Sequence, residues 1–166
     1  MSLRTALAVS LLVGSTLLVS GCATPYDIGN ADPRVTPVEA AKDVAGMLNH
    51  TVAWGGLIAA AKNLKDKSEI EVVGYPLDSE NRPSHDAKPT GRFLVIQPGY
   101  LETADYAPGR LITVVGTVAE TRRGTVCEAN YIYPVVVATK LQLWPKAASE
   151  RREPSFHFGI GVGIIH

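Results

Sequence analysis

The sequence predicts a mainly β domain, a small barrel of five strands preceded by one short helix. Five segments rich in β-branched or apolar residues are each bounded by Gly, Pro or charged clusters, which is the composition of strands. They span residues 51–61, 68–77, 91–99, 110–120 and 133–144. Four glycines inside them weaken strand propensity but permit the bends of a small closed barrel; they are Gly55, Gly56, Gly74 and Gly116. This pattern favours an oligonucleotide/oligosaccharide-binding (OB) type barrel. A sandwich of similar size is the competing architecture.

A short amphipathic helix is predicted over residues 37–48. Thr36 has the side chain of an N-cap, Pro37 suits the first helical position, and Glu39 completes a capping box. Apolar residues at helical spacing predict one packed face; they are Val38, Ala41, Ala45 and Leu48. The connection over residues 100–108 has room for only a turn or two of helix.

Period-two alternation predicts which strand side chains share a face. In residues 110–120, the inward set is Ile112, Val114, Gly116 and Val118, while Thr113 and Thr117 face outward. In residues 133–144, one face is predicted to hold Val137, Thr139, Leu141 and Leu143. Trp54 is expected to pack in the core and Trp144 to close the end of the barrel, with sugar stacking as the alternative.

Residues 1–21 are predicted to be a cleaved export signal. Arg4 is their only charge, an apolar run from Thr5 to Val19 follows it, and small residues precede Cys22. The run is shorter than the roughly 20 residues that a spanning helix needs. We therefore expect the chain to be exported without spanning a membrane.

The pattern Leu18-Val19-Ser20-Gly21-Cys22 resembles the lipobox of bacterial lipoproteins. That resemblance implies lipid transfer to the Cys22 sulfur, cleavage before Cys22 and acylation, for example with palmitate, of the new amino terminus. Two or more acyl chains make a stable anchor, whereas one binds only marginally. By analogy with that family, Ala23 implies transport onward to the outer membrane. An ordinary secretory signal with an incidental cysteine is the alternative.

Cleavage before Cys22 would leave 145 residues (166 minus 21), a length that suits one domain. Removing Arg4 leaves 15 basic and 16 acidic residues, a formal charge of −1. Such a balance argues against a nucleic-acid binder, which usually carries a basic excess. With Cys22 acylated, Cys127 is the one remaining thiol, so we expect no internal disulfide. Cys127 itself is expected to be a partly buried thiol without a chemical role.

Three further segments complete the chain. Residues 22–35, rich in Pro, Gly and small polar residues, are predicted to be the lipid anchor and a tether. Residues 36–145 are predicted to form the barrel domain with its helix, and residues 146–166 a charged linker and a Gly-rich apolar tail. Apolar residues alternate with polar residues or glycine in the tail, as in an extended strand. Docking on protein, docking on the membrane and disorder are the alternatives for the tail.

The sequence contains no recognisable catalytic or metal-binding motif. None of the four histidines (His50, His85, His157 and His166) has a partner at metal-ligand spacing. A nucleophile elbow, a glycine-rich phosphate loop and an HExxH pair are also missing. We therefore predict a non-enzymatic protein with no metal and no cofactor.

OB-type folds bind ligands on the face of strands two and three and at the loops joining strands 1–2 and 4–5. In this sequence those loops carry five cations: Lys62, Lys65, Lys67, Arg122 and Arg123. Cations gathered at one end of a barrel would bind phosphate or carboxylate. Acidic neighbours offset part of this charge, so two solvated polar loops are the alternative.

Five segments, in this order and spacing, resemble the Slp family of bacterial outer-membrane lipoproteins. They are WGGLI (54–58), YPLDSENRP (75–83), GRFLV (91–95), GYLETADYAPGRLITVVGTV (99–118) and LQLW (141–144). The resemblance covers about residues 36–145, and we find none in the tail. It implies an outer-membrane lipoprotein from a family tied to starvation and stress physiology, with no catalytic or ligand-binding residues to carry over.

Together these observations predict a periplasm-facing, lipid-anchored, non-enzymatic structural or stress-associated module of the envelope. The alternative is an OB-type binding protein for an anionic envelope glycan or lipid. The expected partners are outer-membrane lipid, through the acylated terminus, and an envelope protein or an anionic glycan or lipid, but no nucleic acid.

Overall fold

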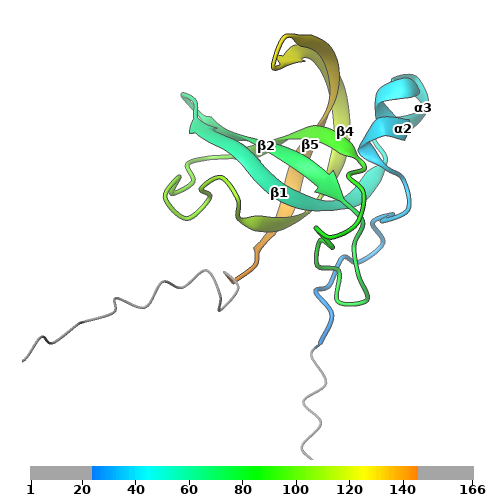
Figure 1. Cartoon of the computed structure of the whole chain (residues 1–166), viewed down its shortest axis with the longest axis vertical. Coiled ribbons are helices and arrows are strands. Elements are labelled where there is room, and N and C mark those ends of the chain that lie inside the picture. The colour runs from blue at the N-terminus through cyan, green and yellow to red at the C-terminus, as the bar shows by residue number, and fades with distance from the viewer. Residues whose placement is uncertain (1–23, 146–166) are drawn as a thin grey trace, which may run out of the picture.

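The computed structural model describes residues 24–145, and within them five strands close into a barrel in the order β1-β2-β3-β5-β4 (Figure 1). The strands are β1 (Thr51–Asn63), β2 (Lys67–Tyr75), β3 (Gly91–Pro98), β4 (Leu111–Val126) and β5 (Ala129–Leu143). Neighbouring strands are antiparallel except β3 and β5, which pair in parallel. The predicted five-stranded barrel is confirmed, and closure of the sheet excludes the sandwich.

The barrel interior is filled by aromatic and β-branched side chains. Phe93 is fully buried, and Trp54, only 3% exposed, packs edge-on against it with ring centroids 5.2 Å apart. Core packing of Trp54 is therefore confirmed. The inward face predicted for residues 110–120 is also confirmed, because Ile112 and Val118 lie in this core. Burial of such apolar surface is the main term that stabilises a small domain.

The face predicted for the last strand is partly wrong because β5 contains a bulge. Gly116 pairs with Ala138 and Val115 with Lys140, so Thr139 is an extra residue in β5. An extra residue reverses the alternation of side chains beyond it. Ala138 therefore points into the core, and Val137 packs outside the barrel with its neighbours on β3 and β5.

Two short helices replace the single helix predicted over residues 37–48. They are α2 (Pro37–Lys42) and α3 (Val44–Met47), separated at Asp43, whose backbone is not helical. The Asp43 side chain accepts a hydrogen bond from the Gly46 amide and so caps α3. The capping box is confirmed, since the Thr36 hydroxyl accepts from the Glu39 amide and the Glu39 carboxylate accepts from the Thr36 amide.

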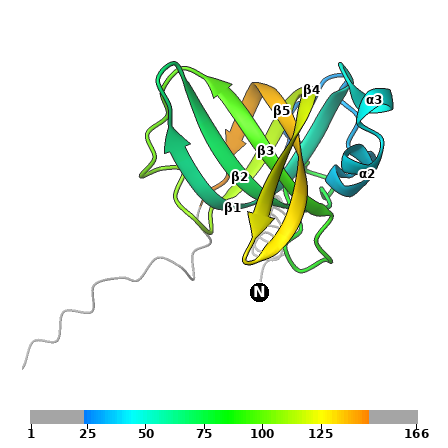
Figure 2. The ribbon, with the colours of Figure 1, turned by 90° about the horizontal axis from the view of Figure 1, so that it is seen from above.

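The apolar face predicted for this helix is wrong. Val38 and Leu48 are 38% and 42% exposed, whereas Pro37 and Ala40 are buried. The reason is that α2 packs against β3 and β5 at the side of the barrel. There only one side of this short helix meets the core, at positions three residues apart such as Pro37 and Ala40. Figure 2 shows both helices beside the barrel wall.

The segment before the helices packs on the barrel instead of forming the free tether that we expected. Asp32 forms a parallel bridge with Val52, and Ala31 is buried against Ala53. The Tyr26 amide donates to the Glu80 carbonyl at 3.0 Å. The described part of the predicted tether, residues 24–35, is thus attached to the outer surface of the domain.

The connection between β4 and β5 is a long hairpin, not the polar loop that the sequence predicts between the strands 110–120 and 133–144. β4 continues to Val126, β5 begins at Ala129, and only two residues form the turn. Cys127 in that turn is exposed and has a positive φ of 54°, so the expected partial burial of this thiol is wrong. The hairpin extends across the outer face of β2 and β3 (Figure 2).

Residues 100–108 form turns without a helix, and Leu101 and Tyr106 from this segment pack against the core. Between residues 24 and 145, no helix is long and apolar enough to cross a membrane. The predicted export signal, the lipidation site Cys22 and the tail over residues 146–166 lie outside the described residues.

Candidate functional site

The outer face of β2 and β3, where OB-type folds bind ligands, is covered in this protein by its own β4–β5 hairpin. An apolar cluster joins the two layers: Leu94 and Ile96 of β3 pack with Tyr133 and Val135 of β5. Two carboxylates of β2, Glu69 and Glu71, alternate with core residues and so point to this outer face. Each of them binds a residue of the hairpin.

Glu69 is the most buried of the ion-paired carboxylates, with its side chain 8% exposed. Lys62, its register partner on β1, lies 2.8 Å away, and Arg122 of β4 donates a hydrogen bond to its other oxygen. Burial alone raises the pKa of Glu69, but the hydrogen bonds and charges of Lys62 and Arg122 outweigh it, so this pKa lies below its usual value. Glu69 is therefore ionised and neutralised by its own chain.

Glu71 forms the second polar contact between β2 and the hairpin. Arg92 Nη1 lies 2.8 Å from its carboxylate, and the Tyr133 hydroxyl donates to the same oxygen at 3.0 Å. Burial and the hydrogen bond to Glu71 raise the pKa of Tyr133 to about 12. The Tyr131 hydroxyl accepts from the Arg92 amide at 2.8 Å. The hairpin is thus attached to β2 and β3 by polar groups as well as by packing.

The structure brings together only part of the predicted cationic site. Lys62 and Arg122 meet on Glu69, and Arg122 also contacts Glu120 at 3.1 Å. Arg123 is exposed and alternates with Arg122 along β4, so it points to the other side of the hairpin. The placement of Arg122 and Arg123 in a loop is wrong, because both are strand residues. In the sequence, the only indication of these ion pairs was the acidic residues Glu69 and Glu71 in the predicted strand 68–77.

Lys65 and Lys67 lie at the turn between β1 and β2, which contacts the segment after β3. The Gly99 amide donates to the Asp66 carbonyl at 3.1 Å, and the Leu101 amide donates to Ser68 Oγ at 3.0 Å. Tyr100, between these two contacts, is 74% exposed. This end of the barrel therefore presents an exposed aromatic residue in the segment that contacts the turn bearing the two lysines, an arrangement not predicted from the sequence.

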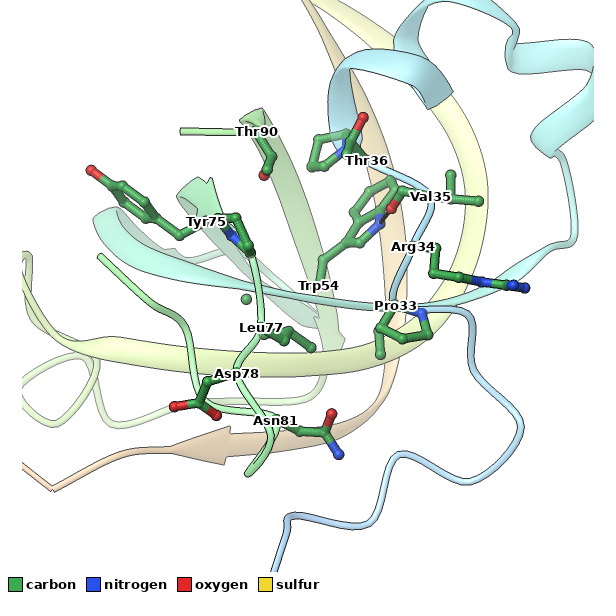
Figure 3. Close-up of a pocket in the computed structure, with 14 residues that line it drawn as sticks. Pro33, Arg34, Val35, Thr36, Trp54, Tyr75, Leu77, Asp78, Asn81 and Thr90 are labelled. Carbon is green, nitrogen blue, oxygen red and sulfur yellow. Dashed lines mark hydrogen bonds between the residues drawn. The ribbon is translucent and has the colours of Figure 1, made fainter. Parts of the chain in front are cut away.

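A pocket of about 320 Å³ lies between residues 33–37, the start of β1 and the end of β2 (Figure 3). Trp54 forms one wall and donates a hydrogen bond from Nε1 to the Val35 carbonyl at 2.6 Å. Because so little of its ring is exposed, Trp54 offers almost no surface for stacking. Asp78, on the rim, accepts from the Glu80 and Arg82 amides and so stabilises its own loop. The pocket is at the lower end of the roughly 300–1,000 Å³ of small-ligand sites.

Trp144 directly follows β5 and packs on the outer face of β4, so the prediction that it closes the end of the barrel is wrong. Its Nε1 donates to Thr113 Oγ1 at 2.9 Å, and Thr113 in turn donates to the Asn81 carbonyl at 2.7 Å. Thr113 is therefore fully buried although it lies on the outer face of β4. Within residues 24–145, no three side chains of His, Cys, Asp or Glu are grouped as metal ligands.

A model of the Outer membrane lipoprotein Slp family matches residues 19–160. The match begins before Cys22 and extends beyond residue 145, where our sequence analysis found no resemblance. Among relatives, the chain is 37% identical over 95 residues to an uncharacterized protein of Haemophilus influenzae, covering 57% of this chain and 51% of that protein. It thus spans about half the length of the Haemophilus protein.

Two proteins of Escherichia coli K12 match over longer regions. The uncharacterized lipoprotein YeaY is 28% identical over 138 residues, covering 81% of this chain and 71% of YeaY. The outer membrane protein Slp is 26% identical over 139 residues, covering 81% of this chain and 73% of Slp. A crystal structure of the small single-stranded DNA-binding protein from Streptomyces coelicolor aligns with a TM-score of 0.34 and 15% identity, over 58% of this chain and 95% of that one. That similarity is too low to support any argument about ligands.

Proposed function

Because this chain belongs to the outer membrane lipoprotein Slp family, we propose that it is a non-enzymatic structural module of the envelope whose barrel faces the periplasm. Its localisation is the outer membrane, as for the family and for the relative named outer membrane protein Slp. The proposal adds Cys22 as the acylated residue, the periplasmic orientation, the absence of catalysis and a role during starvation or envelope stress.

The docked N-terminal segment is the observation that carries this proposal. Tyr26 is hydrogen-bonded to the barrel, and it stands only four residues after Cys22. Four residues span at most about 14 Å when fully extended. An acyl chain on Cys22 would therefore hold the barrel directly against the membrane surface, as suits a module that stabilises the envelope at that surface.

The ion pairs of two acidic residues, Glu69 and Glu71, support the non-enzymatic part of the proposal. Glu69 and Glu71 are each held by cations, and Glu71 also accepts from Tyr133. Glu69, which has a lowered pKa and a cation on each carboxylate oxygen, serves poorly as a general acid or base near neutral pH. These residues instead join the hairpin to the barrel wall.

Cys127 provides a direct test of the orientation. It is exposed at the hairpin turn, and with Cys22 acylated it is the only thiol in the chain. A membrane-impermeant maleimide is expected to leave Cys127 unlabelled in intact Gram-negative cells and to label it once the outer membrane is permeabilised. The Cys127→Ser variant controls for background. Labelling in intact cells would contradict the periplasmic orientation.

The envelope role is tested in a strain that lacks the gene. In starved cultures we expect increased sensitivity to detergent with EDTA, reversed by the wild-type gene but not by Cys22→Ser. Equal sensitivity of the deletion and wild-type strains would contradict a structural role without bearing on the anchor.

Binding of an anionic envelope glycan or lipid is a second candidate, and exposed Tyr100 near Lys65 and Lys67 favours it. Lys62 and Arg122 no longer belong to this candidate, because they are paired with Glu69 and Glu120. In titrations with lipopolysaccharide and with soluble peptidoglycan fragments, Lys65→Glu with Lys67→Glu should weaken binding at least about tenfold, or about 1.4 kcal/mol. The matched control is Lys42→Glu with Lys88→Glu. Equal affinity of both double variants would rule out this end of the barrel.

A further inference from the structure

Three segments that are distant in the sequence meet around Tyr26, close to the predicted anchor. The Tyr26 ring lies edge-on to Trp144 at the end of β5, with centroids 6.5 Å apart and an interplanar angle of 77°. The Arg82 guanidinium, from the loop between β2 and β3, lies 5.6 Å from the centroid of the Trp144 ring. We call these three residues the Tyr26–Trp144–Arg82 cluster.

Hydrogen bonds hold the cluster in a fixed position on the barrel. The Tyr26 amide donates to Glu80, and Asn81 Nδ2 donates to the Tyr26 carbonyl at 2.8 Å. Trp144 is fixed by its bond to buried Thr113. Both aromatic rings are nevertheless only half-buried, so each keeps an accessible surface.

The position of the cluster in the molecule points to what contacts it. In Figure 1 the described chain begins at the lower side of the barrel, and the turn of the β4–β5 hairpin projects from the opposite side. Figure 2, seen from above, has the hairpin nearest the viewer. The reach from Cys22 to Tyr26 is at most about 14 Å, so an anchored chain must have the cluster close to the lipid headgroups.

The chemistry of the cluster suits that location. Trp and Tyr are enriched where a membrane meets water, because their rings are apolar and their edges polar. Arg binds phosphate with two parallel hydrogen bonds. Among residues 24–145, Arg82 has no carboxylate within ion-pair distance, so its charge is available to an outside group.

We propose that the Tyr26–Trp144–Arg82 cluster is a second membrane contact, which seats the barrel on the headgroups of the leaflet that holds the anchor. Arg82 pairs with a lipid phosphate, the two aromatic rings lie in the interface, and the β4–β5 hairpin points away from the membrane. The lipid thereby fixes the orientation of the barrel as well as its location. This inference rests on the proposed acyl anchor at Cys22.

The test uses the purified, acylated full-length protein in phosphatidylethanolamine/phosphatidylglycerol vesicles, with and without a headgroup-spin-labelled lipid. Trp144→Phe leaves only Trp54, which is 3% exposed in the core. We expect the spin label to quench wild-type tryptophan emission at least twofold more than that of Trp144→Phe. Arg82→Gln should lower the wild-type quenching by about half, whereas Arg123→Gln, a matched exposed arginine, should not change it.

A pair of single-cysteine probes tests the orientation without altering either tryptophan. One is a fluorophore on native Cys127 at the hairpin turn; the other is on Ser79→Cys in a Cys127→Ser background. Ser79 is exposed and adjoins Glu80, which contacts Tyr26. The probe at residue 79 should be quenched at least threefold more than the probe at Cys127.

Equal quenching of the two probes, or stronger quenching at Cys127, would overturn the inference. Unchanged quenching in Arg82→Gln would overturn the phosphate contact. Flotation with the vesicles and the intact mass are measured on the same samples. Protein that floats and carries acyl mass but lacks the quenching pattern overturns this inference alone, whereas protein without acyl mass overturns the proposed anchor together with it.

Discussion

Arg122 on β4 donates a hydrogen bond to the Glu69 carboxylate on β2, a strand that is not its neighbour in the barrel. The contact joins the β4–β5 hairpin to the face on which OB-type folds bind ligands. Lys62 binds the other oxygen of Glu69, so one buried carboxylate connects three strands. In this protein, that face is therefore occupied by the chain itself.

Replacing Arg122 by Ala should destabilise the domain by about 1–3 kcal/mol, because a charged hydrogen bond is lost and Glu69 keeps only one cation. Arg123→Ala is the matched control, and as an exposed residue without such a contact it should change stability by less than about 0.5 kcal/mol. Urea denaturation of residues 24–145 measures both variants. Equal effects of the two substitutions would contradict the ion-pair assignment.

The depressed pKa of Glu69 predicts a loss of stability in acid. Its contribution is fully present above the ordinary pKa of 4.5 and is lost as pH falls below that value through the lower pKa of the folded state. Glu69→Gln should therefore be less stable than wild type at pH 7, and the difference should shrink below about pH 4. Thermal unfolding at a series of pH values measures this, and a constant difference across the range would refute it.

Among the described tyrosines, Tyr133 should lose its hydroxyl proton at the highest pH. Its pKa of about 12 lies above the ordinary value of 10.0, so its contribution to stability is present below pH 10 and is lost as pH rises towards 12. In absorbance titrations at about 295 nm, Tyr133→Phe should remove the component that titrates at the highest pH. Retention of the late component in Tyr133→Phe would contradict the contact with Glu71.

Gly56→Ala should destabilise the barrel by at least about 2 kcal/mol, because overpacking displaces backbone as well as side chains. A Cβ at position 56 would overlap the Val73 carbonyl on β2. In Gly46→Ala the added Cβ meets only the Asp43 side chain, so the cost should be limited to the loss of the α3 cap, about 1 kcal/mol. Denaturation midpoints compare the two, and similar midpoints would argue against close approach of β1 and β2.

The sequence was informative wherever a strand has one face in the core. Apolar alternation in residues 110–120 predicted the inward position of Ile112 and Val118, and the five apolar segments predicted five strands. The bulge at Thr139 was not predicted, because an extra residue in a strand does not change its amino-acid composition. The β4–β5 hairpin was not predicted either. Its strands are largely solvated from Glu120 to Ile132, so the sequence there shows no alternation of apolar and polar residues.

Contacts between distant segments limited what could be predicted about the site. The five cations were found from their types and positions, but pairing of Arg122 with Glu69 depends on a register that the sequence does not reveal. The docked N-terminal segment is held by backbone hydrogen bonds and by single residues such as Ala31, and neither leaves a periodic signal. Its composition therefore resembled that of a flexible tether.

Intact mass measured together with membrane fractionation tests whether Cys22 anchors this barrel in the outer membrane. Wild type and Cys22→Ser are expressed side by side in a Gram-negative host. We expect a mature wild-type chain that starts at Cys22, carries added acyl mass and fractionates with the outer membrane, and we expect the variant to lose all three properties. A soluble wild-type chain without acyl mass would contradict the anchor and the membrane contact that depends on it.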